Sequence, residues 1–182
     1  MKFKIALTVF ILAAFTVANA QNKHVVKAEL AYASENYSEA SKLCATAYMK
    51  LTRKGKAAKL KKAEMAFKTA ECYRLTEHYR DANEWYDRAI LLEYYNTAPE
   101  VYLYNGDMLQ MMSEHDKAIT NFDLYLGLVP NDERGVTGKQ SSEMNKTYIA
   151  EKTRHTIENQ AALNKQEFDM APMFGDRKTS KL

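Results

Sequence analysis

The sequence is poor in the residues that build catalytic, metal-binding or disulfide-rich proteins. Its 182 residues include two cysteines, three prolines and six glycines. Two cysteines are too few for a disulfide framework, and the scattered glycines form no loop that could cradle a phosphate. The four histidines lie far apart, without the spacing of metal ligands. The sequence therefore predicts a protein that is not an enzyme and that holds no cofactor or metal ion.

The sequence also lacks a large excess of positive or negative charge. The formal net charge is +3 at pH 7, and it falls to +1 without Lys2 and Lys4, which lie in a segment that we expect to be removed. A nearly neutral protein has no general electrostatic attraction to nucleic acid or to an anionic membrane. We therefore expect no nucleic-acid partner.

Long apolar runs are absent after the first twenty residues. Before that point, two lysines precede an uncharged run from Ile5 to Val17, and residues 18–20 read Ala-Asn-Ala. This order is typical of a cleaved secretory signal peptide, because the apolar run is short against the ~20 residues that span a bilayer. We expect residues 1–20 to be removed and the chain from Gln21 to be exported to the periplasm, where it can associate with the outer membrane. No transmembrane segment is expected after cleavage.

The two cysteines, Cys44 and Cys72, would then lie in an oxidising compartment, where they could form a disulfide bond. The alternative, which we favour, is that each is a small buried apolar residue inside a helix, since free cysteine is among the most buried residue types. The sequence does not decide between the two states.

What the sequence does contain is an internal repeat. Segments 37–40, 79–82 and 115–118 read YSEA, YRDA and HDKA, and their final alanines are 42 and 36 residues apart. These segments resemble tetratricopeptide repeats, in which a small residue of a first helix packs against an alanine of a second helix. The small residues of the first helices are Ala28, Ala70 and Gly106, and the alanines are Ala40, Ala82 and Ala118. Larger core positions follow at Cys44, Tyr86 and Phe122, and then at Ala47, Ala89 and Tyr125.

The resemblance implies an all-α, right-handed solenoid of about three helix pairs with a capping helix. The predicted pairs are Val25–Ser34 with Ser38–Thr52, Ala58–Leu75 with Tyr79–Glu93, and Pro99–Met112 with His115–Leu128. We assign the extra length of the first repeat to Leu51–Lys62, where Gly55 can end a helix. After Pro130, Asn131 is expected to cap a further helix that runs to about Glu151.

The first helices of such a solenoid line a concave groove, and the repeat predicts which residues face it. An apolar residue is followed four positions later by a carboxylate in each pair, which puts both on one helix face. Such a groove suits an extended or helical peptide with apolar anchors and basic or N–H donors. The alternative is that the carboxylates only solvate the helix surface. The predicted groove residues are Val25, Glu29, Tyr32, Phe67, Glu71, Arg74, Leu103, Asp107, Gln110 and Met111.

A basic run from Arg53 to Lys62 holds six cationic residues. We interpret it as a solvated linker between helices. The alternative function is cell-wall or carbohydrate binding, through this run and exposed tyrosines.

Several longer sequence segments resemble those of a multidomain envelope family. Residues 71–75 read ECYRL, 79–90 read YRDANEWYDRAI, and 116–135 read DKAITNFDLYLGLVPNDERG. Residues 163–164 read LN, and 169–175 read DMAPMFG. These segments and their order resemble the N-terminal region of the PorE-type family, which consists of OmpA-like, WD40-like periplasmic proteins of the type IX secretion system.

That resemblance implies a repeat domain over 21–151 and an extended tail over 152–182 that resembles the start of a WD40-like propeller. It also implies a non-enzymatic scaffold in a secretion or gliding assembly, with other envelope proteins or their peptide segments as partners. Peptidoglycan binding is expected only of a C-terminal OmpA-like domain, which lies outside these 182 residues.

Overall fold

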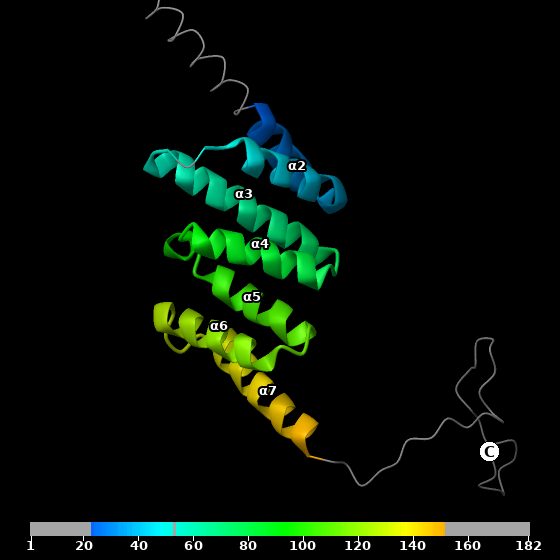
Figure 1. Ribbon diagram of the computed structural model, residues 1–182, viewed down its shortest axis with the longest axis vertical. Coiled ribbons are helices and arrows are strands. Elements are labelled where there is room, and N and C mark those ends of the chain that lie inside the picture. The colour runs from blue at the N-terminus through cyan, green and yellow to red at the C-terminus, as the bar shows by residue number, and fades with distance from the viewer. Residues whose placement is uncertain (1–22, 53, 152–182) are drawn as a thin grey trace, which may run out of the picture. The chain divides into compact units, whose positions relative to one another are not determined.

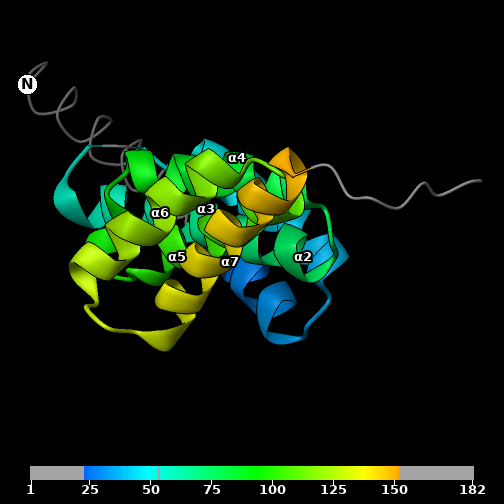
Figure 2. The same cartoon turned by 90° about the horizontal axis from the view of Figure 1, so that it is seen from below.

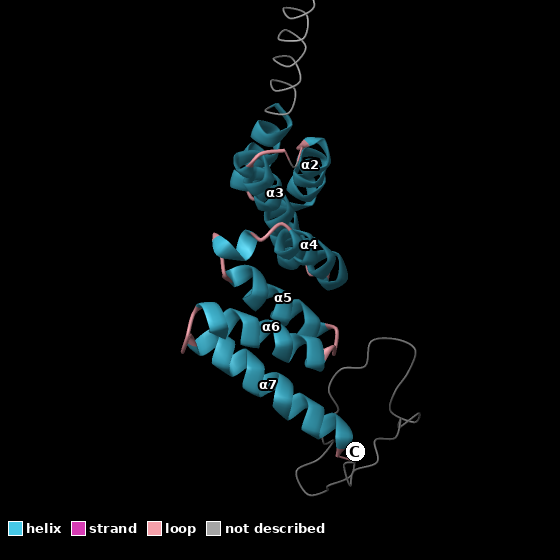
Figure 3. Ribbon diagram, turned by 60° about the vertical axis from the view of Figure 1, so that its left-hand side comes forward, coloured by secondary structure: helices cyan, strands magenta, loops and turns pink. Residues whose placement is uncertain are grey.

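The computed structural model describes residues 23–52 and 54–151, and every regular element in these ranges is helical. Figure 3 shows the described segments as helices joined by short loops. Residues 23–33 are helical and are followed by α2 (Tyr37–Lys50), α3 (Lys56–Leu75), α4 (Tyr79–Leu91), the short 3-10 helix η1 (Tyr94–Asn96), α5 (Glu100–Met111), α6 (His115–Leu128) and α7 (Glu133–Ala150). The predicted signal peptide and tail lie outside the described residues.

The helices stack in chain order. Figure 1 shows α2 to α7 following one another along the stack, and each helix from α2 to α6 packs against the next. The described residues up to Tyr148 form one compact unit. The all-α solenoid of helix hairpins that the sequence predicts is confirmed, and the predicted ends of α2 to α6 lie within two residues of the observed ends.

Each of the three hairpins turns through a residue in the left-handed backbone region. These residues are Glu35, Glu77 and Ser113, with φ of 58°, 61° and 62°. After α3 the N–H of His78 donates to the carbonyl of Tyr73 at 2.9 Å, and after α5 an equivalent bond joins residues 114 and 109 at 2.8 Å. Such bonds satisfy carbonyl groups that the last helical turn leaves free. The repeat is therefore present in the turns as well as in the helices.

The small residues of the repeat form the centre of the solenoid. The alanines predicted to pack between the first and second helices are fully buried, namely Ala28, Ala70, Ala40, Ala82 and Ala118. The predicted core residues that follow them are also fully buried, namely Cys44, Ala47, Tyr86, Ala89, Phe122 and Tyr125. Cys72 is also fully buried, and both cysteines are free thiols inside helices. The structure thus has the cysteines in the buried state that we favour.

Gly106 lies close to the ring of Phe122. A methyl group at Gly106 would lie 2.7 Å from that ring, and one at Gly138 of α7 would also lie 2.7 Å from it. The Phe122 side chain of α6 is therefore held between two glycines, one on α5 and one on α7. Figure 2, seen from the α7 end, shows α7 lying across α5 and α6.

Most of the basic run is helical and does not form the linker between the first two hairpins. Helix α3 begins at Lys56 and so includes most of the basic run, while Gly55, with φ of 88°, precedes α3 instead of ending α2. The side chain of Lys62 is buried, and its ammonium group donates to the carbonyl of Leu51 at 2.7 Å. The prediction of a solvated linker up to Lys62 is therefore wrong, because the long lysine stem fills space beside α2 and its charge finds a buried acceptor.

The start of α7 also differs from the prediction. Asn131 lies in the turn with φ of 65°, and Asp132 accepts a hydrogen bond from the N–H of Arg134 at 2.9 Å. Asp132 therefore caps the helix in place of Asn131. Its carboxylate also accepts from the hydroxyl of Tyr125 at 3.0 Å, which joins the cap to α6.

Candidate functional site

Residues 23–33, α3, α5 and α7 supply the first helices of successive hairpins, and together they make what we call the first-helix face. Side chains meet from one of these helices to the next, as where the Arg74 guanidinium of α3 lies 4.6 Å from the ring centre of Tyr104 on α5. On α5, Gln110 donates to the carbonyl of Gly138 on α7 at 3.1 Å. The predicted groove residues all come from these helices, but the structure gives them different environments.

Two of the predicted groove residues belong to the core. Val25 is 6% exposed and Leu103 is 2% exposed, so neither is on the surface. Phe67 is partly buried in a cluster of aromatic rings, 5.2 Å from the ring of Tyr94 and 5.9 Å from that of Tyr86. The prediction of an apolar groove floor is wrong for Val25 and Leu103, because a helix inside a stack has neighbours on two sides and buries a wide apolar stripe.

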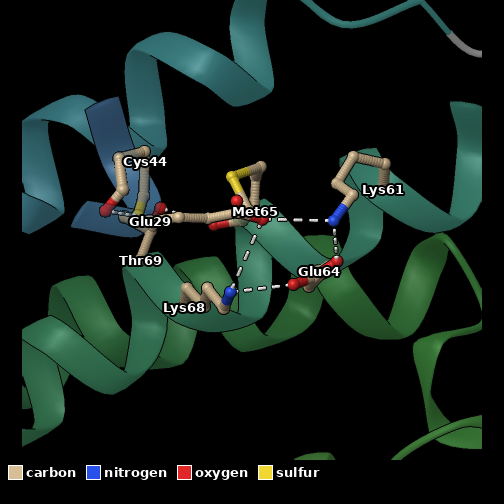
Figure 4. Close-up of polar contacts among 8 residues, drawn as sticks. Glu29, Cys44, Lys61, Glu64, Met65, Lys68 and Thr69 are labelled. Carbon is tan, nitrogen blue, oxygen red and sulfur yellow. Dashed lines mark hydrogen bonds and ion pairs between the residues drawn. The ribbon is translucent and has the colours of Figure 1, made fainter. Parts of the chain in front are cut away.

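Glu29 is part of a ring of alternating charges, which we call the charge ring. Lys61 lies 3.2 Å from Glu29 and 2.8 Å from Glu64, and Lys68 lies 2.8 Å from Glu64 and 4.0 Å from Glu29. Figure 4 shows these side chains between the first helical segment and α3. Two carboxylates and two ammonium groups cancel, so the charge ring joins two helices without leaving a net charge on the face.

Glu71 is buried and is held by two partners, an arrangement that we call the Glu71 fork. The guanidinium of Arg74 donates to both carboxylate oxygens, at 3.1 and 2.7 Å, and the hydroxyl of Tyr86 donates to one of them. Bidentate pairs of this kind are strong and fix the geometry of both groups. The hydrogen bonds that the Arg74 guanidinium donates to Glu71 raise the pKa of this guanidinium. Burial and the nearby carboxylate raise the pKa of the Tyr86 hydroxyl, which therefore stays protonated.

Asp107 is the third carboxylate of the predicted row, and it has no such partner. Its side chain is partly buried, and it makes no hydrogen bond or ion pair with any residue in the described ranges. Burial raises its pKa from 3.8 to about 6, while the cations of Arg74 and Arg134 act in the opposite direction. Both arginines are bound to other carboxylates, Arg74 to Glu71 and Arg134 to Asp132.

The remaining predicted residues lie near this carboxylate or further along the face. Met111, one helical turn after Asp107, is 63% exposed. Tyr32 is partly buried beneath the ammonium of Lys68, which is 5.6 Å from its ring centre, and burial raises the pKa of the Tyr32 hydroxyl to about 12. The side chain of Gln110 is already bound to α7. Among the predicted groove residues, therefore, Asp107 is the carboxylate without a partner in the described ranges, and the exposed apolar side chain of Met111 lies beside it.

The basic run contributes little free charge. Lys59 pairs with Glu93, Lys61 belongs to the charge ring, and Lys62 is buried. Arg53 lies outside the described residues. The run is therefore largely a set of contacts between helices, which weakens its interpretation as a surface for cell-wall or carbohydrate binding.

An amide network joins α4, α5 and α6, and the sequence analysis did not predict it. Asn105 of α5 is buried, accepts a hydrogen bond from Asn83 at 2.6 Å, and donates to Asp87 at 3.0 Å and to Asn121 at 3.4 Å. Each of the three asparagines is adjacent in sequence to a buried position of the repeat (Ala82, Gly106 or Phe122), and this recurrence was the signal that could have indicated the network. Because a buried amide needs partners, this network fixes the order of the three helices.

Two further classes of site were sought in the described part of the chain. Among residues 23–52 and 54–151 no group of His, Cys, Asp or Glu is arranged to hold a metal ion. Within the same ranges no helix combines the length and apolar character needed to cross a bilayer.

Comparisons with known proteins address the fold. No protein-family model and no curated protein matches the sequence. Among solved structures, the TPR domain of Arabidopsis OM64 is similar to this chain with a TM-score of 0.56 at 15% sequence identity, over 71% of this chain and 98% of that chain. A likeness at this identity concerns the fold alone. With the repeated hairpins it shows that the chain is an all-α solenoid of the tetratricopeptide type.

Proposed function

We propose that the chain is an exported, non-enzymatic scaffold that binds a segment of another envelope protein on its first-helix face. The observation that supports this most directly is the unpaired carboxylate of Asp107. A partly buried carboxylate without a donor is costly in the free protein. A partner that supplies an N–H group or an ammonium group would remove that cost on binding.

The surroundings of Asp107 define the chemistry of the partner. Met111 lies four residues later on α5, so its exposed side chain is on the same side of the helix. Methionine adapts its shape to varied apolar partners. A suitable segment therefore has an apolar side chain next to a basic residue or a free backbone N–H. Glu29 and Glu71 are excluded as primary contacts, because their charges are already balanced within the chain.

The cellular setting is part of the same proposal. The basic and apolar order of residues 1–20 supports export to the periplasm. The resemblance of several sequence segments to the PorE-type family supports a place in an outer-membrane-associated secretion (type IX) or gliding assembly. The solenoid fold supports a scaffold, since the helix faces of such folds offer extended binding surfaces.

A capture experiment tests the proposal. The chain from Gln21 is immobilised and incubated with envelope extract of the source organism, next to Asp107→Asn, Met111→Ala and the control Glu84→Gln, an exposed residue of α4. We expect a specific partner that is retained by the control and lost or strongly reduced with both face variants. Equal capture by all four proteins would refute the proposed contact surface.

The pH of the incubation provides a second readout. A cation or N–H donor bound to Asp107 favours the ionised carboxylate, so the bound state has a lower pKa than the value of about 6 in the free protein. Binding should then be tightest above about pH 6 and should weaken as the pH falls through that value. Asp107→Asn should remove this pH dependence. A pH dependence that survives in the variant would show that another group carries it.

The alternative, a cell-wall or carbohydrate-binding module, has less support. Tyr86 is fully buried, Trp85 is only 9% exposed and so offers no broad platform, and most of the described basic run is engaged within the chain. Sedimentation of the protein with purified cell wall tests it, and cosedimentation that is lost with Lys54→Gln and Lys56→Gln would favour this alternative.

A further inference from the structure

A pocket lies on the other side of the hairpins, between the second helices α2 and α4. It has a volume of about 530 Å³ and is lined mainly by apolar surface, to which Tyr48, Met49 and Trp85 contribute. Its charged lining residues are Lys50 and Arg88. None of these residues belongs to the first-helix face, so the pocket is independent of the function proposed above.

The floor of the pocket is rigid. The rings of Tyr48 and Trp85 meet edge to face, with centres 5.2 Å apart and planes at 85°. The guanidinium of Arg88 lies 4.1 Å from the ring centre of Trp85, and the ammonium of Lys62 lies 4.6 Å from that of Tyr48. Such edge-to-face and cation–π contacts hold the rings in place. Little conformational freedom would be lost when a side chain settles on them.

The charges around this floor have one sign. Lys50 makes no ion pair with any described residue, and Arg88 has only a long one, 3.7 Å from the exposed carboxylate of Glu84. No acidic residue of the described ranges lines the pocket. The side chain of Met49 is 73% exposed beside the rings. An apolar floor with a cationic rim is complementary to an apolar group that has a carboxylate next to it.

We propose that this pocket is a second docking site, which binds a peptide segment of a partner protein through an apolar, preferably aromatic, side chain flanked by acidic residues. The pocket has the size of sites that hold small groups, and the ring fits the Tyr48–Trp85 floor while the carboxylates reach Lys50 and Arg88. A membrane surface is a poorer match, because lipid headgroups are bound by clusters of four or more cations and the pocket offers two.

Trp85 makes the proposal measurable, because it is the one tryptophan of the 182 residues. Its fluorescence is titrated with a short synthetic peptide that has a central phenylalanine between two glutamates. We expect a saturable change, with affinity about tenfold lower for a peptide with alanine in place of phenylalanine and for one with lysines in place of the glutamates. Equal affinity for the acidic and the basic peptide, or no saturable change with any of them, would overturn the proposal.

Variants assign the binding to the pocket. Lys50→Gln with Arg88→Gln should weaken binding of the acidic peptide by about tenfold or more. The matched control is Arg80→Gln, an exposed residue of α4 outside the pocket, which should leave the affinity unchanged. Equal losses in the control and in the double variant would overturn the assignment. Far-UV circular dichroism establishes that each variant is folded.

Two further arms separate this site from other surfaces. Asp107→Asn should bind the acidic peptide as the unchanged protein does, so failure of the first-helix-face proposal and failure of this one are distinguishable. Vesicles that contain an anionic phospholipid serve as the competing occupant. If they change the Trp85 fluorescence in a way that depends on Lys50 and Arg88, and the peptide does not, the pocket is a membrane contact and the peptide proposal is wrong.

Discussion

On the first-helix face most charged side chains are held by partners from the same chain, whereas the cations around the Trp85 pocket on the second helices have almost no carboxylate partners among the described residues. Two of the three carboxylates that recur at the same repeat position are paired within the chain, Glu29 in the charge ring and Glu71 in the Glu71 fork. Around the pocket, Lys50 and Arg88 have at most one long ion pair with the described residues. A charged residue that recurs in the repeat is therefore not always free to bind a partner. The contacts between neighbouring helices decide which charges a partner can reach.

The largest expected effect comes from breaking the Glu71 fork. Glu71→Ala removes the partner of Arg74 and of the buried Tyr86 hydroxyl at once. Removing one member of a buried, hydrogen-bonded pair costs about 3 kcal/mol, since the other charge is left without compensation. We expect the free energy of unfolding to fall by about this amount in urea titrations. A loss below about 1 kcal/mol would show that the fork behaves like an exposed pair.

A smaller loss is expected from Gly138→Ala, which tests the packing of α7. Its new methyl group would lie 2.7 Å from the Phe122 ring, so the ring or α7 has to shift. Overpacking of this kind costs about 1–3 kcal/mol. The control is Gly127→Ala in α6, where a methyl group has no neighbour within 4 Å. Because alanine favours a helix more than glycine does, the control should gain up to about 1 kcal/mol. Urea unfolding measures both, and equal changes in the two variants would contradict the packing described for Phe122.

Asp107→Asn should instead stabilise the free protein, in a pH-dependent way. The folded-state pKa of about 6 lies above the ordinary value of 3.8. Folding therefore binds a proton, and the stability of the unchanged protein falls as the pH rises from about 4 to about 6 and is level above that. The variant avoids this loss and should be more stable by about 1–2 kcal/mol at pH 7.5, allowing for partial exposure, and by little at about pH 4. Urea unfolding at both pH values is the measurement, and a difference that is largest at low pH would contradict it.

The smallest effect is expected for the charge ring. Glu29→Gln removes one carboxylate from a ring whose side chains are partly exposed. Pairs of this kind contribute about 0.2–1 kcal/mol and are weakened by salt. The unfolding free energy should therefore fall by about 0.5 kcal/mol at low salt and by less in about 1 M sodium chloride. A loss as large as that of Glu71→Ala would remove the distinction between the two kinds of pair.

The sequence was sufficient to predict the helices and the small side chains that pack where two helices cross. Apolar residues at helical spacing and the recurring alanines predicted α2 to α6 closely, since small side chains are required wherever two helix axes approach. The close approach of α7 was not predicted. Gly135, Gly138 and Ser142 are spaced so that they lie on one face of α7, and this spacing was the signal that could have indicated its contact with α6.

The candidate site was less predictable, for a physical reason. The state of a carboxylate depends on side chains that are distant in the sequence, as where Lys61 reaches Glu29 across 32 positions. Spacing within one helix shows which residues share a face, but it does not show which of them the next helix neutralises. Glu29 and Asp107 occupy the same repeat position, yet one is paired and the other is not.

The position of Phe122 between Gly106 and Gly138 has a consequence for the integrity of the chain. The ring has no contact with water because a helix lies on either flank. Proteolysis in the loop at Pro130 that released α7 would uncover one side of a large aromatic group on an otherwise folded protein. Such a clipped species would be expected to self-associate through the uncovered ring, so α7 protects the solubility of the hairpins before it.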